Sequence, residues 1–208
     1  MKSFMKWSKG IIYLCQLIFL ISSIYLICTL RFDRLILLLG SLLLTFVPEI
    51  YTKWTKVNIP IGARLFYVLF IFAAQWLGSY LGFYGYIFFW DVLLHATSGV
   101  FIGYVALIIL VSLDKDHTLF KQNKISVIVT FILAVGIAAA GIWEMIEFAG
   151  DTFLNTNAQL GSLQDTMEDI ICGTLGSCVF AIYTGVVMKA KRKSCIDQLL
   201  YMNRGKNK

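Results

Sequence analysis

Three short stretches of the chain carry acidic residues, and one of them a histidine, inside sequence that is otherwise mostly apolar. They are "FFWDVLLHATSG" (88–99), "GIWEMIEFAGD" (141–151) and "GSLQDTMEDIICG" (161–173). Their ionisable side chains are Asp91, His95, Glu144, Glu147, Asp151, Asp165, Glu168 and Asp169. Carboxylates and an imidazole are ligands for divalent cations and can also act as acids and bases. These stretches are therefore where the chain could do chemistry.

The spacing within each stretch places its ionisable side chains on one face of a helix. Asp91 and His95 are four positions apart, and Glu144 and Glu147 are three apart. Residues at these spacings are neighbours on a helix surface, where like charges repel by about 0.2–0.5 kcal/mol. The repulsion grows when the groups lose water. We expect protons or a metal cation to neutralise such a site.

These ionisable side chains are expected to lie on membrane-spanning helices. Of the 208 residues, 59% are hydrophobic and 14% are charged, whereas a soluble domain carries about 25% charged residues. Apolar runs of roughly 20 residues, enough to cross about 30 Å of hydrocarbon, recur along the chain. The sequence predicts an all-α transmembrane bundle that forms one integral membrane domain over 1–208. Its six predicted spans are 11–30, 34–51, 64–83, 86–112, 125–148 and 167–188.

Lysine and arginine predict the orientation of the bundle. They gather at the N-terminus, in the connections 52–64 and 113–124, and in a basic tail over 189–208, all on one side of a six-helix path. The positive-inside rule then places both termini in the cytoplasm. The net charge of +6 is explained by these topology signals and by contacts with anionic membrane lipids. Nucleic acid is not an expected partner.

This orientation brings the three acidic stretches to the extracytoplasmic end of three consecutive helices. Seven of the 12 acidic residues meet there, with almost no lysine or arginine. An ionisable residue inside a span is costly and is a candidate for function. We expect metal ligands among Asp91, His95, Glu144, Glu147, Asp151, Asp165 and Asp169. Of these, Asp91, His95, Glu144, Glu147 and Asp169 are also the expected catalytic residues.

The ligand types leave the identity of the cation open. Zinc, manganese, magnesium or ferrous iron would all accept carboxylates with one imidazole. Zinc would be satisfied by one histidine and two or three carboxylates, which leaves a position for water. The chain has no HExxH pattern. Its five cysteines form no CxxC or Cys/His pattern, and we interpret them as small packing residues.

Several of these residues also fit structural roles. Ser162 lies three residues before Asp165, so Asp165 and Glu168 fit the start of a capped helix. Asp151 fits a solvated helix end, and the remaining ionisable residues could form a hydrogen-bonded cluster that only holds helices together. Trp143 fits an interfacial belt. Four glycines favour close helix packing: Gly99, Gly103, Gly173 and Gly176.

The order of these motifs resembles the YjdF-like family of small bacterial inner-membrane proteins, and more distantly the VanZ-like family linked to teicoplanin resistance. The resemblance rests on "WDVLLHATSG", "WEMIEFAGD" and "QDTMEDIICGTLG" and covers roughly residues 80–180. It marks Asp91, His95, Glu144, Glu147, Asp151, Asp165, Asp169 and Gly176. Where VanZ-like proteins tend to have an asparagine after the last aspartate, this chain has Cys172. The resemblance implies a bacterial plasma membrane and no particular reaction.

Three functions fit these observations. The first is a metal-dependent hydrolase or transferase for a lipid-linked substrate, with the cation on Asp91, His95, Glu144 and Asp169 and with Glu147 as general base. The second is a transporter coupled to protons or cations, because carboxylates and histidine form such relays. The third is a non-catalytic membrane protein with a structural acidic cluster.

Overall fold

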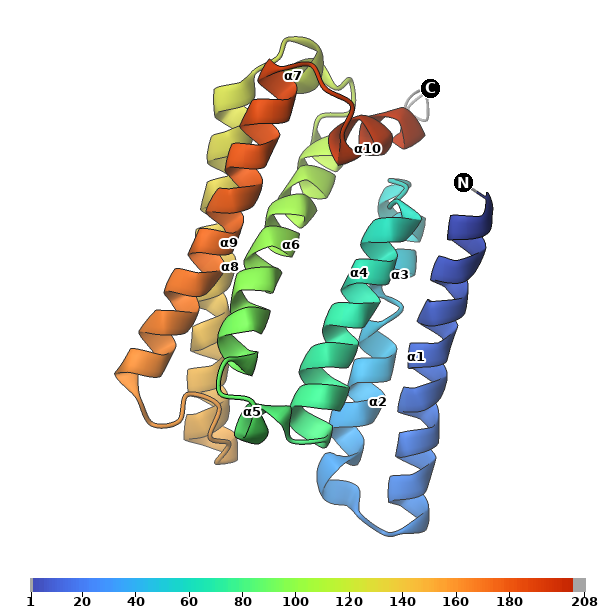
Figure 1. Ribbon diagram of the computed structural model, residues 1–208, viewed down its shortest axis with the longest axis vertical. Helices are drawn as coiled ribbons and strands as arrows, with labels where there is room; N and C mark the ends of the chain where they lie inside the picture. Colours follow the sequence, from blue (N-terminus) through green and yellow to red (C-terminus); the bar gives the residue numbers. More distant parts are fainter. Residues whose placement is uncertain (1, 204–208) are drawn as a thin grey trace. The chain divides into compact units, whose positions relative to one another are not determined.

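The structure is a computed structural model that describes residues 2–203, and this part of the chain is all helical (Figure 1). Six of its segments are long and apolar enough to cross a membrane. They are Ser3–Cys28, Leu35–Thr55, Ile61–Tyr80, Trp90–Leu113, Ile125–Leu154 and Leu163–Lys189. The predicted all-α fold with six spans is therefore confirmed.

The chain divides into two compact units, Met1–Trp90 and Asp91–Lys208. The first unit is built around α1 (Lys2–Cys28), which packs against α2 (Leu35–Leu44) and α4 (Ile61–Ile71). Its other elements are η1 (Phe32–Arg34), α3 (Val47–Thr55), η2 (Phe72–Tyr80) and α5 (Phe83–Tyr86). Phe19, Leu26 and Leu38 form a buried cluster at its centre. Burial of these side chains between helices holds the unit together.

Two of the spans in the first unit are irregular. The second span divides into α2 and α3, and Pro48 lies in the first turn of α3, where its missing N–H costs nothing. The second span is therefore two helices rather than one continuous helix. The third span continues from α4 into the π-helical η2 and ends at Tyr80, earlier than predicted. The first helix, in contrast, begins at Lys2, because polar residues at a helix end carry no hydropathy signal.

Several polar side chains in the first unit are paired across helices. Arg64 Nη1 lies 3.0 Å from Glu49 Oε1, and its Nη2 donates to Thr52 Oγ1 over 3.0 Å. Trp76 Nε1 donates to Ser22 Oγ over 3.0 Å. Such pairs offset the cost of placing polar groups in an apolar setting.

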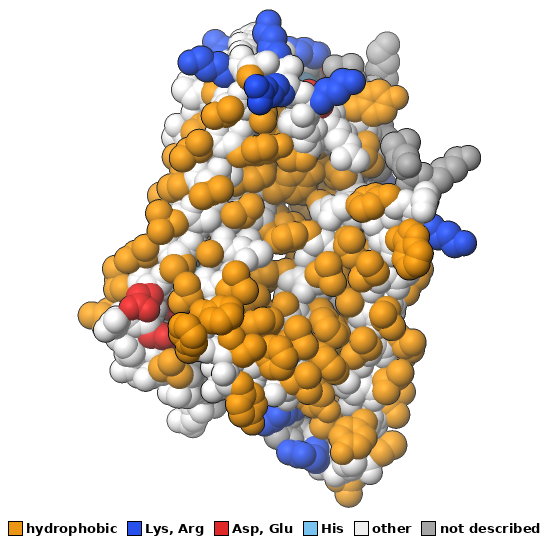
Figure 2. Space-filling view, viewed as in Figure 1, with side chains coloured by type: hydrophobic (Ala, Val, Ile, Leu, Met, Phe, Trp, Pro, Cys, Tyr) orange, Lys and Arg blue, Asp and Glu red, His pale blue; other side chains and the backbone are white. Residues whose placement is uncertain are grey.

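The second unit consists of three long helices and two short ones. They are α6 (Trp90–Leu113), α7 (Thr118–Lys121), α8 (Ile125–Leu154), α9 (Leu163–Lys189) and α10 (Cys195–Asn203). The long helices lie side by side, with the start of α6, the end of α8 and the start of α9 at the end of the unit opposite α7 (Figure 1). Lysine and arginine gather at the α7 end, and acidic side chains lie toward the opposite end (Figure 2).

Glycines let α6 and α9 approach each other closely. A Cβ atom on Gly99 would lie 2.0 Å from the carbonyl oxygen of Gly173, and one on Gly176 would lie 2.1 Å from that of Ala96. Ser177 Oγ donates to the carbonyl oxygen of Gly99 over 2.9 Å. The predicted close packing at these glycines is confirmed, and it brings the acidic start of α9 against the start of α6.

Of the five cysteines, only Cys15 is buried, and Cys28 is exposed. All five are free thiols. Cys195, which begins α10, lies 3.9 Å from the Tyr183 hydroxyl, and burial raises the pKa of its thiol. A raised pKa keeps a thiol protonated and unreactive.

Candidate metal centre

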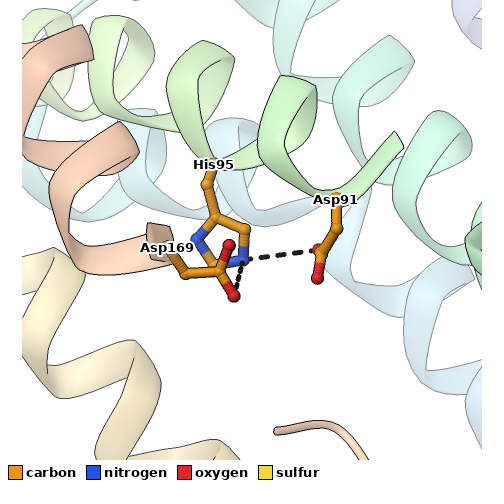
Figure 3. Close-up of side chains that lie close together, drawn as sticks. All are labelled: Asp91, His95 and Asp169. Atoms are coloured by element: carbon orange, nitrogen blue, oxygen red, sulfur yellow. Dashed lines mark ion pairs between the residues drawn. The ribbon is translucent and has the colours of Figure 1, made fainter. Parts of the chain in front are cut away.

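The first two turns of α6 and of α9 bring a histidine between two aspartates. His95 Nε2 lies 3.5 Å from Asp91 Oδ1 and 3.6 Å from Asp169 Oδ2 (Figure 3). The side chain of Asp91 is 35% exposed, whereas those of His95 and Asp169 are 11% and 3% exposed. The group is therefore partly exposed on the Asp91 side and closed around Asp169.

Asp169 also belongs to a second group, with Glu144 and Glu147 from the end of α8. In each group, one ligand atom from every residue lies within 4.8 Å of the others. Glu144 is only 4% exposed. Five of the predicted site residues, from three helices, thus form two groups that meet at one buried carboxylate.

Each glutamate of α8 has one oxygen held by a nitrogen donor. Trp143 Nε1 donates to Glu147 Oε1 over 2.8 Å, and Gln159 Nε2 donates to Glu144 Oε2 over 3.3 Å. Donors of this kind orient carboxylates that bind metals. The other oxygen of Glu144, Oε1, is buried without a hydrogen-bond partner, as is Asp169 Oδ2. Neither of these buried oxygens accepts a hydrogen bond that would compete with a cation.

Asp151 is used by the loop that connects α8 to α9. Its carboxylate accepts hydrogen bonds from the Thr156 hydroxyl and from the backbone N–H groups of Ala158 and Gln159, the last two over 2.7 and 2.9 Å. The structure does not bring Asp151 into either ligand group. Instead, Asp151 orders the loop that delivers Gln159 to Glu144.

Asp165 and Glu168 lie at the start of α9 beside the two groups but in neither of them. Ser162 Oγ accepts from the backbone N–H of Asp165 over 3.3 Å, so Ser162 is the predicted N-cap. The N–H of Ser162 donates to the carbonyl oxygen of Gln159 rather than to Asp165, so the capping box is half formed. Glu168 is exposed and accepts from Gln164 over 2.7 Å. Asp165 Oδ2 is buried without a hydrogen-bond partner.

The site contains no basic side chain other than His95. The sequence has neither lysine nor arginine from residue 65 to 114 or from 125 to 188. The described lysines and arginines of the second unit lie instead near α7, in the last turn of α9 and just after it. Among the described residues of the second unit, no arginine or lysine therefore balances the negative charge at the site.

Sequence reasoning missed two residues that hold the site. Gln159 lies in a connecting loop, where helical spacing makes no prediction. Trp143 fits an interfacial tryptophan, and the sequence does not show that its indole N–H reaches the carboxylate one turn later. A tryptophan four residues before a glutamate on a helix is a signal that could have indicated this bond.

Comparisons with known proteins agree with a membrane protein. The sequence profile of the family described as "Predicted membrane protein (DUF2238)" matches residues 11–190, and the chain belongs to this family. An "Uncharacterized protein" of Thermotoga maritima is 34% identical over 146 residues, which are 67% of this chain and 73% of that protein. No solved structure matches the chain. The protein is thus a multi-pass membrane protein, and the family match covers every residue of the site.

Proposed function

We propose that this member of the DUF2238 family is a metal-dependent hydrolase or transferase that acts on a lipid-linked substrate at the extracytoplasmic face of the bacterial plasma membrane. The observation that carries the proposal is that Glu144 and Asp169, beside His95, each have a buried carboxylate oxygen without a hydrogen-bond partner. An unpaired buried charge costs several kcal/mol. A bound cation removes that cost.

The distances around His95 fit a metal ion better than direct hydrogen bonds. Charge-assisted hydrogen bonds between nitrogen and carboxylate oxygen are about 2.7–2.9 Å long, whereas the two separations here are 3.5 and 3.6 Å. Two ligand atoms on one tetrahedral zinc, with bonds of about 2.1 Å, are roughly 3.4 Å apart. The geometry supports a cation held by Asp91, His95 and Asp169.

The remaining residues support a reaction at that cation. A bound divalent cation would activate a water molecule and polarise a phosphoryl or acyl oxygen of the substrate. Glu147, which Trp143 holds in place, would act as general base. Asp91 lies on the accessible side of the group, where the substrate would enter. The resemblance to YjdF-like proteins supports a bacterial plasma membrane.

Metal binding by the whole chain in detergent tests this proposal. After treatment with a chelator, the protein is titrated with Mn²⁺, Zn²⁺ or Mg²⁺, and bound metal and Tm are measured. A cation at 100 times its Kd stabilises by about 2.7 kcal/mol, so Tm is expected to rise by several degrees. Asp91→Ala and Glu144→Ala are expected to reduce this rise, whereas His117→Ala, at the distant α7, is the matched control.

Turnover is measured with the same protein. Bacterial polar lipids are incubated with metal-loaded protein, and the products are analysed by mass spectrometry. Metal-dependent loss of a lipid species supports the enzyme. Absence of metal binding, with Asp91→Ala and Glu144→Ala behaving as wild type, contradicts it. Proton or cation flux in proteoliposomes that His95→Ala abolishes, without any lipid turnover, would identify a transporter instead.

A further inference from the structure

Asp169 is the one residue that belongs to both ligand groups. It projects from α9, with Asp91 and His95 of α6 in one group and Glu144 and Glu147 of α8 in the other. A carboxylate has two oxygens, and each can bind a different metal ion. Asp169 is therefore placed to bridge two ions rather than to complete one.

The second group, like the first, contains a buried carboxylate oxygen without a hydrogen-bond partner. Gln159 and Trp143 each hold one oxygen of a glutamate. Glu144 Oε1 remains buried and without a hydrogen-bond partner, although Glu144 is only 4% exposed. Glu144 belongs to the second group alone, so a cation held by Asp91, His95 and Asp169 leaves this buried oxygen without a ligand.

The charges of the site also favour two cations. Asp91, Glu144, Glu147 and Asp169 together bring four carboxylates, and the surrounding sequence from 125 to 188 brings no lysine or arginine. Two divalent cations balance four carboxylates, whereas one cation leaves half of the negative charge unbalanced. Since unbalanced charge is costly in a desolvated site, the balanced arrangement is the more stable one.

We propose that the site holds two divalent cations bridged by Asp169, one with Asp91 and His95 and the other with Glu144 and Glu147. This inference rests on the proposed metal-dependent function and specifies its reaction. Two-metal sites hold their ions about 3.5–4 Å apart and contact both the attacking and the leaving oxygen of a phosphoryl group. They also supply the positive charge that arginine or lysine supplies in other phosphoryl-transfer sites. The substrate class is therefore a lipid phosphate ester.

The reaction balances with water as the only co-reactant. A water oxygen forms a bond to phosphorus, and the bond from phosphorus to the lipid oxygen breaks. One proton of the water passes to the lipid oxygen, which leaves as an alcohol, and the phosphate is released. Nothing is oxidised or reduced in this step.

The number of Mn²⁺ ions bound per chain tests this proposal directly. We expect whole protein loaded with Mn²⁺ in detergent to retain two ions per chain and to give the electron paramagnetic resonance spectrum of two exchange-coupled Mn²⁺ ions. His95→Ala and Glu144→Gln are each expected to lower the count to one and to remove the coupling. Asp169→Asn is expected to remove the coupling as well. Glu168→Gln changes an exposed carboxylate outside both groups and is expected to keep both ions.

The number of Mn²⁺ ions that the wild-type protein retains distinguishes a two-metal centre, a single-metal centre and a protein that binds no metal. A wild-type count of one, with the spectrum of an isolated Mn²⁺ ion, overturns the two-metal centre and leaves a single-metal enzyme standing. A count of zero overturns both proposals. This wild-type measurement does not depend on whether a variant folds.

Inorganic phosphate tests the substrate class on the same sample. We expect phosphate to bind to the Mn²⁺-loaded protein and to change the coupled spectrum, and to bind at least tenfold more weakly after metal removal. Phosphate that leaves the spectrum of the doubly loaded protein unchanged overturns the assignment of a phosphate ester and leaves the two-metal centre intact.

Discussion

The two units of the chain treat acidic side chains in opposite ways. In the first unit, Glu49 lies 3.0 Å from Arg64, which also donates to Thr52 and to the carbonyl oxygen of Ile59. In the second unit, Glu144 and Asp169 are far more buried than Glu49, yet each has an oxygen without a hydrogen-bond partner. The first arrangement stabilises the fold. The second retains unsatisfied binding capacity, which is what a ligand site requires.

Helix packing must offset the free-energy cost of burying carboxylate oxygens without hydrogen bonds. Glycines let the backbones of α6 and α9 meet, and α8 packs along α9. Ser177 adds a buried hydrogen bond between α6 and α9. The acidic end is thus held together by contacts one to two turns away from the acids themselves.

The largest expected effect comes from breaking this packing with Gly176→Ala. The new Cβ would lie 2.1 Å from the carbonyl oxygen of Ala96, which is backbone and cannot turn away. We expect the free energy of unfolding to fall by about 3 kcal/mol, with loss of metal binding, in thermal unfolding monitored by circular dichroism. Gly141→Ala is the control, because a Cβ there meets nothing within 4 Å. Equal Tm values for the two variants would show that α6 and α9 are not held at this distance.

A smaller loss is expected from Arg64→Met in the first unit. This variant leaves Glu49 without its cation and removes the bonds to Thr52 and Ile59. We expect the free energy of unfolding to fall by about 1–2 kcal/mol, since the pair is partly exposed. The same thermal measurement applies. Adding Glu49→Gln to Arg64→Met should recover part of the loss, and no recovery would mean that the unpaired charge is not its cause.

The smallest expected effect is a gain in stability, in the variant Glu144→Gln. Glu144→Gln removes one negative charge from the group of Glu144, Glu147 and Asp169 while keeping the side chain's shape. In metal-free protein we expect Tm to rise, by up to about 1 kcal/mol of unfolding free energy, because like charges no longer repel. With Mn²⁺ present the order should reverse. A lower Tm than wild type without metal would mean that Glu144 is already satisfied.

Most of the candidate site could be predicted because its signals are local. Asp91 with His95, and Glu144 with Glu147, share helix faces by spacing alone, and the order of the spans places them at one end. The roles of Asp151 and Gln159 could not be predicted, because both depend on the path of a loop. Asp165 and Asp169 share a helix face by spacing, yet only Asp169 joins both ligand groups.

The number of apolar helices, and the end of the bundle at which the acidic residues gather, could be predicted from the sequence alone. Both depend on length, hydropathy and charge, which are properties of each segment by itself. The tertiary structure decided which carboxylates meet. That outcome depends on how far each helix is inserted and how it is rotated about its axis against its neighbours, which the glycines of α6 and α9 set through backbone contact. Asp169 thus became the shared residue, because it lies one turn deeper on α9 than Asp165.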